Sequence, residues 1–186
     1  HEAAHAVVYA KLFGFAPTQI VTEGTNDKAF VGMHSFMQTK EVLKNLISVL
    51  KAGQISEIMY FGDSIQSNGS VSDIFEATRH AANIFRRFAM GPYHTHRQPI
   101  TTDPGSTVAS NLDIESTNDM MENLITEQMS RATDILRENK PLLDEVSEAL
   151  VKDGFMSPKR FKEFSDKHGL VVEVRDAKDT ICFGIE

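Results

Sequence analysis

Residues 1–13, HEAAHAVVYAKLF, contain the pattern H-E-x-x-H within an otherwise apolar run. Side chains four positions apart lie on one face of a helix, so His1 and His5 can direct two imidazole nitrogens at one point. Two such nitrogens, a third protein ligand and a water make up the coordination of a catalytic Zn2+ site. Glu2 would flank the metal, where a carboxylate can take the proton of a water that attacks a carbonyl. The stretch therefore predicts a buried helix that carries two zinc ligands and a general base.

The motif is short and stands at the start of the sequence. It has only three fixed residues, so an amphipathic helix with two unrelated histidines stays open as an alternative. The first N–H groups of a helix lack intrahelical partners, and a ligand on a fraying terminus would be badly held. We therefore expect further residues ahead of His1; in the other case, the free amine of His1 would itself compete for the metal.

The composition is that of an ordinary globular chain, with 41% hydrophobic and 24% charged residues among 186. This length suits one domain with a core of ordinary size. The formal charge of -7 and the lack of a basic stripe argue against a nucleic-acid partner. Cys182 is the one cysteine, which excludes internal disulfides and fits a reducing compartment such as the cytoplasm. No run of 18 apolar residues is present, so we predict no membrane segment in these residues; an upstream anchor would place the chain at the cytoplasmic face of a membrane.

Hydrophobic periodicity predicts a mainly α-helical array with a small β-ribbon. The β-branched and aromatic residues on either side of Gly24–Asp27 indicate a hairpin or two neighbouring strands over residues 18–38. The tail predicts two further short strands around a turn at Asp176–Asp179, that is, an extra C-terminal β-hairpin. We therefore expect one zinc-binding domain over residues 1–169, with residues 170–186 as a β-ribbon appendage of it. Helices are expected at residues 1–13, 39–61, within 67–90, and at 116–139, 141–151 and 158–168.

Two further positions bear on a metal site. Ser70 is followed three residues later by Asp73, as in a capping box, which places Asp73 in the first turn of a helix. The helix dipole favours an ionised carboxylate there, and a metal ligand must be ionised. Position alone leaves Asp73 open as a cap or as a ligand. The pair His94-x-His96 lies in the long polar stretch 91–115 and is only a weak metal signal.

Four blocks of sequence, in the right order, resemble the peptidase domain of the FtsH-type ATP-dependent zinc metallopeptidases. HEAAHAVV is similar to the HEAGHAxV helix of that family, and AGQISEIMYFG at residues 52–62 is similar to its GGRAAEExxFG stretch. SNGSVSDIFEAT at residues 67–78 resembles its TGASNDxxxAT segment, and residues 130–164 resemble its closing helices. The likeness runs, with gaps, from residue 1 to about residue 168.

This resemblance implies a zinc-dependent metalloendopeptidase that hydrolyses the peptide bonds of protein substrates with a zinc-activated water. By position, it makes His1, His5 and Asp73 the zinc ligands and Glu2 the general base. Glu57 matches a glutamate of the family's AAEE stretch. It would orient a ligating imidazole by accepting its other N–H, or it is a charge on the helix surface.

The resemblance also implies an edge strand beside the site, along which a substrate peptide aligns. Such a strand can hold an extended peptide by backbone pairing. The residues concerned are Val31, Gly32, Met33 and His34; a plain structural hairpin, with His34 as a surface or packing residue, is the alternative. The family is hexameric through an ATPase module, so the expected partners are protein or peptide substrates, further copies of the chain and an ATPase module.

Several residues depart from the family's pattern. Ala4 replaces the glycine of the motif, Gln54 replaces the arginine of GGRAAEE, and the stretches 91–115 and 170–186 lie outside the likeness. No P-loop G-x-x-x-x-G-K-[ST] occurs in these residues, so nothing in them is expected to bind ATP. The departures leave two alternatives open: a catalytically inactive peptidase-derived module that binds proteins, and a zinc peptidase of another lineage with a different third ligand.

Overall fold

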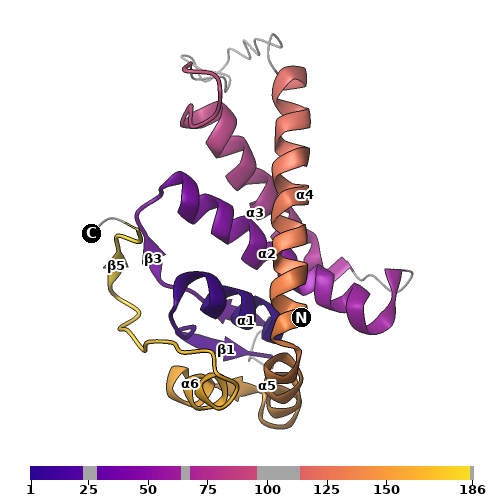
Figure 1. The fold of residues 1–186 in the computed structure, drawn as a ribbon, viewed down its shortest axis with the longest axis vertical. Coiled ribbons are helices and arrows are strands. Elements are labelled where there is room, and N and C mark those ends of the chain that lie inside the picture. The colour runs from indigo at the N-terminus through magenta and orange to yellow at the C-terminus, as the bar shows by residue number, and fades with distance from the viewer. Residues whose placement is uncertain (23–28, 64–67, 96–113, 185–186) are drawn as a thin grey trace, which may run out of the picture.

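The chain is mainly helical, as predicted, with a few short strands on one side (Figure 1). A computed structural model describes residues 1–22, 29–63, 68–95 and 114–184. Within these ranges no helix is long and apolar enough to cross a membrane. The helices are α1 (Glu2–Phe13), α2 (Lys40–Phe61), α3 (Val71–Ala82), α4 (Ile114–Glu138), α5 (Lys140–Asp153) and α6 (Pro158–Lys167), with a 3-10 turn at Asn68–Ser70 before α3 and a π-helical turn at Asn83–Arg87 after it.

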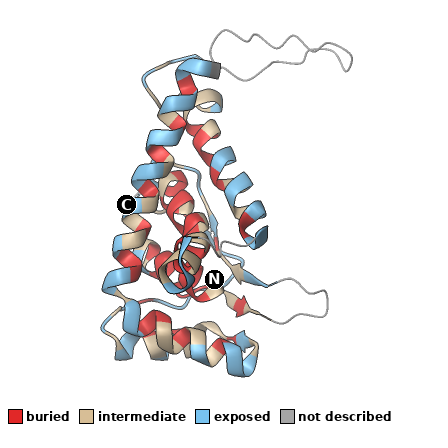
Figure 2. Cartoon of the chain, turned by 90° about the vertical axis from the view of Figure 1, so that its right-hand side faces the viewer, coloured by how far each residue is buried: buried red, intermediate tan, exposed pale blue. Residues whose placement is uncertain are grey.

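Helix α1 lies at the centre of the molecule, and every residue from Ala3 to Ala10 is buried (Figure 2). It contacts α2, α4, α5 and the first two strands. A helix enclosed on all sides is apolar all round, which explains why its sequence shows no polar face. It ends at Gly14, whose φ of 76° is in the left-handed region that glycine adopts without strain. The motif histidines are therefore attached to the most enclosed helix of the fold.

The small ribbon predicted at residues 18–38 is confirmed. Strand β1 (Gln19–Val21) pairs antiparallel with β2 (Phe30–Gly32), and the predicted turn at Gly24–Asp27 lies outside the described residues. On its other side β1 pairs with β4 (Phe155–Met156), a strand between α5 and α6 that the sequence analysis did not predict. The order β2-β1-β4 leaves β2 at the edge of this sheet, where no described strand pairs with its outer side.

Helices α2 and α6 begin at side-chain caps that the sequence provides. The Thr39 hydroxyl accepts from the Val42 N–H at the start of α2, and the Ser157 hydroxyl accepts from the Arg160 N–H at the start of α6. The capping box predicted at Ser70 is wrong. Its hydroxyl makes no cap hydrogen bond and is buried without a partner, because Ser70 belongs to the preceding 3-10 turn.

The C-terminal tail makes the predicted turn, in which the Asp179 N–H donates to the Asp176 carbonyl over 3.1 Å. The predicted self-paired hairpin is wrong. Strand β5 (Thr180–Ile181) pairs parallel with β3 (Ser35–Phe36), and Glu173 forms a bridge with Phe15. A two-stranded ribbon alone is marginally stable, whereas pairing with the body buries apolar side chains of the tail.

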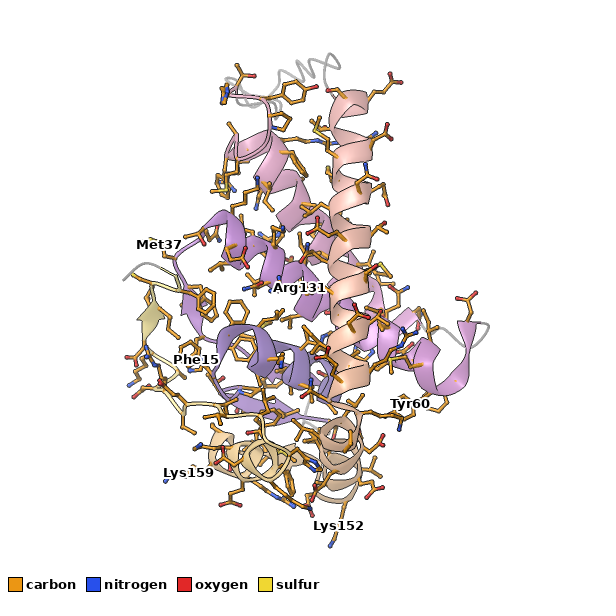
Figure 3. All side chains as sticks on the ribbon, viewed as in Figure 1. Phe15, Met37, Tyr60, Arg131, Lys152 and Lys159 are labelled. Atoms are coloured by element: carbon orange, nitrogen blue, oxygen red, sulfur yellow. The ribbon has the colours of Figure 1, made fainter. Side chains whose placement is uncertain are left out.

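The tail packs over the C-terminal end of α1. Val172 and Ile181 are buried, and the Phe183 ring contacts those of Phe13 and Phe36. Phe15, labelled in Figure 3, lies under the tail, with the Arg175 guanidinium 4.7 Å from its ring centroid. Residues 170–184 therefore form part of the packing around the central helix.

Candidate metal centre

The two motif histidines lie one helical turn apart, and Asp73 of α3 meets them from the other side of the site. The centroids of the His1 and His5 rings are 4.8 Å apart. One carboxylate oxygen of Asp73, Oδ2, is 3.1 Å from His1 Nε2 and 3.3 Å from His5 Nε2. Within the described ranges, these three form the one group of histidine, cysteine and acidic side chains placed to hold a metal ion, with one ligand atom from each lying within 4.8 Å of the others.

The other nitrogen of each imidazole is held by helix α2. His5 Nδ1 is 2.7 Å from the Val49 carbonyl oxygen, and His1 Nδ1 is 2.7 Å from Glu57 Oε1. A carbonyl can only accept, so Nδ1 of His5 is the donor in this hydrogen bond, and Nε2 is the nitrogen that remains for a metal ion. Such outer hydrogen bonds to a carbonyl and a carboxylate are typical of metal-bound histidines. Two imidazole nitrogens and one carboxylate oxygen, oriented in this way, fit Zn2+.

The charges of the site favour an ionised Asp73. Burial raises its pKa, but hydrogen bonds from His1 and His5 outweigh that effect and hold the pKa well below the usual range of a carboxyl. The hydrogen bond to Asp73 raises the pKa of His1 to about 9; burial opposes this shift and Glu57 adds to it. In the absence of metal, His1 therefore carries a proton at neutral pH, and a metal ion must displace it.

Glu2 stands beside the ligands in a partly closed cavity. Burial raises its pKa above that of an ordinary glutamate, while His5 and His1 act in the opposite direction. A carboxylate with a raised pKa is a better proton acceptor, as a general base requires. The cavity has a volume of about 220 Å³, and its wall combines Glu2 and the three candidate ligands with Ala29, Phe30, Val31, Met33, Leu50, Gly69 and Ser72.

The four residues predicted as a substrate-binding strand occupy different positions. Val31 and Met33 line the cavity, whereas Gly32 lies against Thr18 at the β1 side of the ribbon. His34 follows β2 and is buried, with Nδ1 2.6 Å from the Tyr9 hydroxyl and Nε2 3.3 Å from the Arg175 carbonyl oxygen. The side chain of His34 thus packs into the core, and β2 itself borders the cavity.

The sequence indicates some of the residues at the candidate metal centre and not others. The pair His94-x-His96 was a weak metal signal. His94 forms no candidate metal group with the other described residues, and His96 lies outside them. The Val49 carbonyl was missed, because a backbone acceptor leaves no trace in the sequence. Gly53 lies inside helix α2, and a Cβ there would lie 2.3 Å from His1 Nε2. A glycine in the interior of a helix is the signal in the sequence that could have indicated this contact.

A buried helix bearing H-E-x-x-H, a carboxylate delivered by a second helix and a sheet edge beside them define the class of metallopeptidase domains. A sequence profile described as Peptidase family M41 matches residues 1–164. The chain belongs to this family.

Curated relatives agree with this assignment. The chain is 32% identical over 169 residues to the ATP-dependent zinc metalloprotease FtsH of Synechococcus sp. (strain JA-2-3B'a(2-13)), an alignment that covers 82% of this chain and 26% of the relative. It is 28% identical over 174 residues to the ATP-dependent zinc metalloprotease FtsH 3 of Synechocystis sp., covering 82% and 28%. With the FtsH of Neorickettsia risticii it shares 26% over 194 residues, covering 97% and 30%. The chain thus spans between a quarter and a third of the length of these relatives.

Proposed function

We propose that the protein is a zinc-dependent metalloendopeptidase that hydrolyses peptide bonds in protein substrates. The observation that carries this proposal is the convergence of His1 Nε2, His5 Nε2 and Asp73 Oδ2, while α2 occupies the other nitrogen of each ring. A structural ion pair would not need both imidazoles locked with Nε2 facing inward. Membership of Peptidase family M41 and the zinc metalloproteases among the relatives support the same activity.

The chemistry divides between the metal and the residues around it. His1, His5 and Asp73 would hold Zn2+, and Glu57 would keep the His1 ring in its orientation. A bound Zn2+ supplies Lewis acidity, which polarises the scissile carbonyl and acidifies a water. Glu2 accepts the proton of the attacking water and passes it to the leaving amine. The partial burial that raises the pKa of Glu2 suits both steps, since the carboxyl must gain and then release a proton.

The substrate would lie along β2. The outer side of this edge strand can pair with an extended peptide, and Val31 and Met33 give the adjoining cavity an apolar wall. An extended backbone held in this way brings its carbonyl groups past the metal ligands. This arrangement accounts for a protein or peptide substrate without defining its sequence.

ATP dependence, assembly and location are proposed by analogy with the relatives. Those named above are called ATP-dependent, and this chain spans only part of their length. We propose that ATP dependence and assembly into a homo-oligomer, a hexamer by analogy, would come from an ATPase module joined to this domain. A cytoplasmic location, or one at the cytoplasmic face of a membrane, fits the single exposed thiol of Cys182.

The test is Glu2→Gln in the full-length protein, compared with Glu148→Gln on the exposed face of α5. The amide cannot accept the proton, so we expect Glu2→Gln to retain zinc but to lose casein cleavage by about 10²- to 10⁴-fold. Zinc is measured by atomic emission, and cleavage with and without a chelator. Glu148→Gln should match the unaltered protein in both.

Two results would contradict the proposal. Full activity of Glu2→Gln would refute the role of the glutamate. Zinc without any chelator-sensitive cleavage in the unaltered protein would favour a binding module derived from a peptidase.

A further inference from the structure

Helix α2 faces the H-E-x-x-H motif of α1 with residues 49, 53 and 57, one from each of three consecutive turns. Residues four apart lie above one another on the same helix face. The first and the last of these residues each hold one histidine. The Val49 carbonyl contacts Nδ1 of His5, and the Glu57 carboxylate contacts Nδ1 of His1. Gly53 stands between them, at the level of the candidate ligand atoms. The stripe therefore contacts both imidazoles while contributing no metal ligand of its own.

The imidazole of His1 fills the space that a side chain at position 53 would take. A Cβ at residue 53 would lie 2.3 Å from Nε2, 2.5 Å from Cε1 and 2.6 Å from Cδ2 of that ring. The atom in closest conflict is thus the candidate ligand nitrogen itself. Residue 53 lies inside a regular helix, where glycine is less favourable than alanine by about 1 kcal/mol. The backbone conformation does not require glycine at this position. Glycine is required instead because the His1 ring leaves no room for a side chain.

Position 53 also lies close to the contact that holds the second histidine. In a helix the side chain of residue i+4 lies beside the carbonyl of residue i, which is why serine and threonine can bond back to that group. The Val49 oxygen, four residues before Gly53, is 2.7 Å from His5 Nδ1.

We propose that Gly53 is a positioning residue of the metal centre, one that sets where the His1 imidazole stands. This inference rests on the proposed zinc function. In Gly53→Ala, helix α2 cannot retreat because it is packed against α1, α3 and α4, so the His1 ring must swing away from Asp73. The ligand atoms then no longer converge, whereas the metal-free fold tolerates the displaced ring.

The experiment compares Gly53→Ala with Gly91→Ala in the full-length protein. Gly91 is a matched control, since a Cβ there would lie 2.6 Å from Phe85 Cδ1, a similar overlap with a ring away from the metal. We expect zinc binding, measured by chelator competition, to weaken about 10- to 100-fold in Gly53→Ala, the range seen when a residue orienting a ligand is lost. The visible spectrum of bound cobalt(II) should change with it. Gly91→Ala should leave both unchanged.

A double-mutant cycle separates ring placement from a general packing defect. In a His1→Ala background the conflict is gone, so Gly53→Ala should raise the thermal stability of the metal-free protein through helix propensity. Equal destabilisation with and without His1 would overturn the inference. So would unchanged zinc affinity and an unchanged cobalt spectrum in Gly53→Ala, and the proposed function would survive that result. If the unaltered protein bound no zinc, the proposed function would fail, and this inference with it.

Discussion

Zinc binding by the metal-free protein should depend steeply on pH between 7 and 9. The hydrogen bond to Asp73 raises the pKa of His1 to about 9, against an ordinary value of 6.5, and a ligating nitrogen must be free of its proton. With a pKa of about 9, roughly one His1 in a hundred is deprotonated at pH 7 and about half at pH 9. The apparent affinity should therefore rise about 50-fold over this range. A histidine with the ordinary pKa would give a rise of less than about twofold.

The assay is a competition titration of the full-length protein against a chromophoric chelator whose own pH dependence is calibrated in parallel. Glu57→Gln is the informative control. Loss of the Glu57 carboxylate removes one of the causes that raise the pKa of His1, so the slope should become shallower in this variant. A rise of less than about threefold in the unaltered protein would refute the reasoning, because His1 could not then carry a competing proton at pH 7.

Two further substitutions test the third ligand and the tail. Asp73→Ala should lose bound zinc, as measured by atomic emission, while Glu76→Ala, one turn further along α3 and half-buried, should keep it. Unchanged zinc in Asp73→Ala would remove Asp73 from the ligand set. Ile181→Ala should lower the free energy of unfolding by about 2–5 kcal/mol in urea titrations, because Ile181 is 6% exposed. Val171→Ala, at a side chain 79% exposed, should change it by less than about 0.5 kcal/mol, and equal effects of the two would show that the tail is not packed on the body.

The sequence predicted what is local. His1 and His5 share one helical turn, so their convergence required only that residues 1–13 be helical, and the apolar run indicated that. Asp73 lies 72 positions from His1, and its place in a first turn was equally compatible with capping. Only the resemblance to a family chose between the two roles. The structure brings the Asp73 carboxylate to both imidazoles, which no pattern in residues 67–78 could show.

The errors have a common physical cause, which is that short segments do not specify their partners. The tail has the alternation and the turn of a hairpin, but a strand of two residues can pair wherever an apolar surface and a free edge meet. That surface is formed by Phe13 and Phe36, far away in the sequence. Ser70 failed as a cap for a similar reason, since the preceding turn, not the spacing to Asp73, fixes the direction of its side chain.

The two departures from the family's pattern within the described helices leave the candidate chemistry intact. Ala4 is fully buried in α1, between the two histidines in sequence but with its methyl group in the apolar core. Gln54 accepts a hydrogen bond of 2.8 Å from the Lys51 ammonium, so it is engaged within α2. Neither residue belongs to the candidate ligand set, and neither lines the cavity that contains Glu2. Because the proposed hydrolysis would depend on those groups, the two substitutions give no support to a module that binds without cleaving.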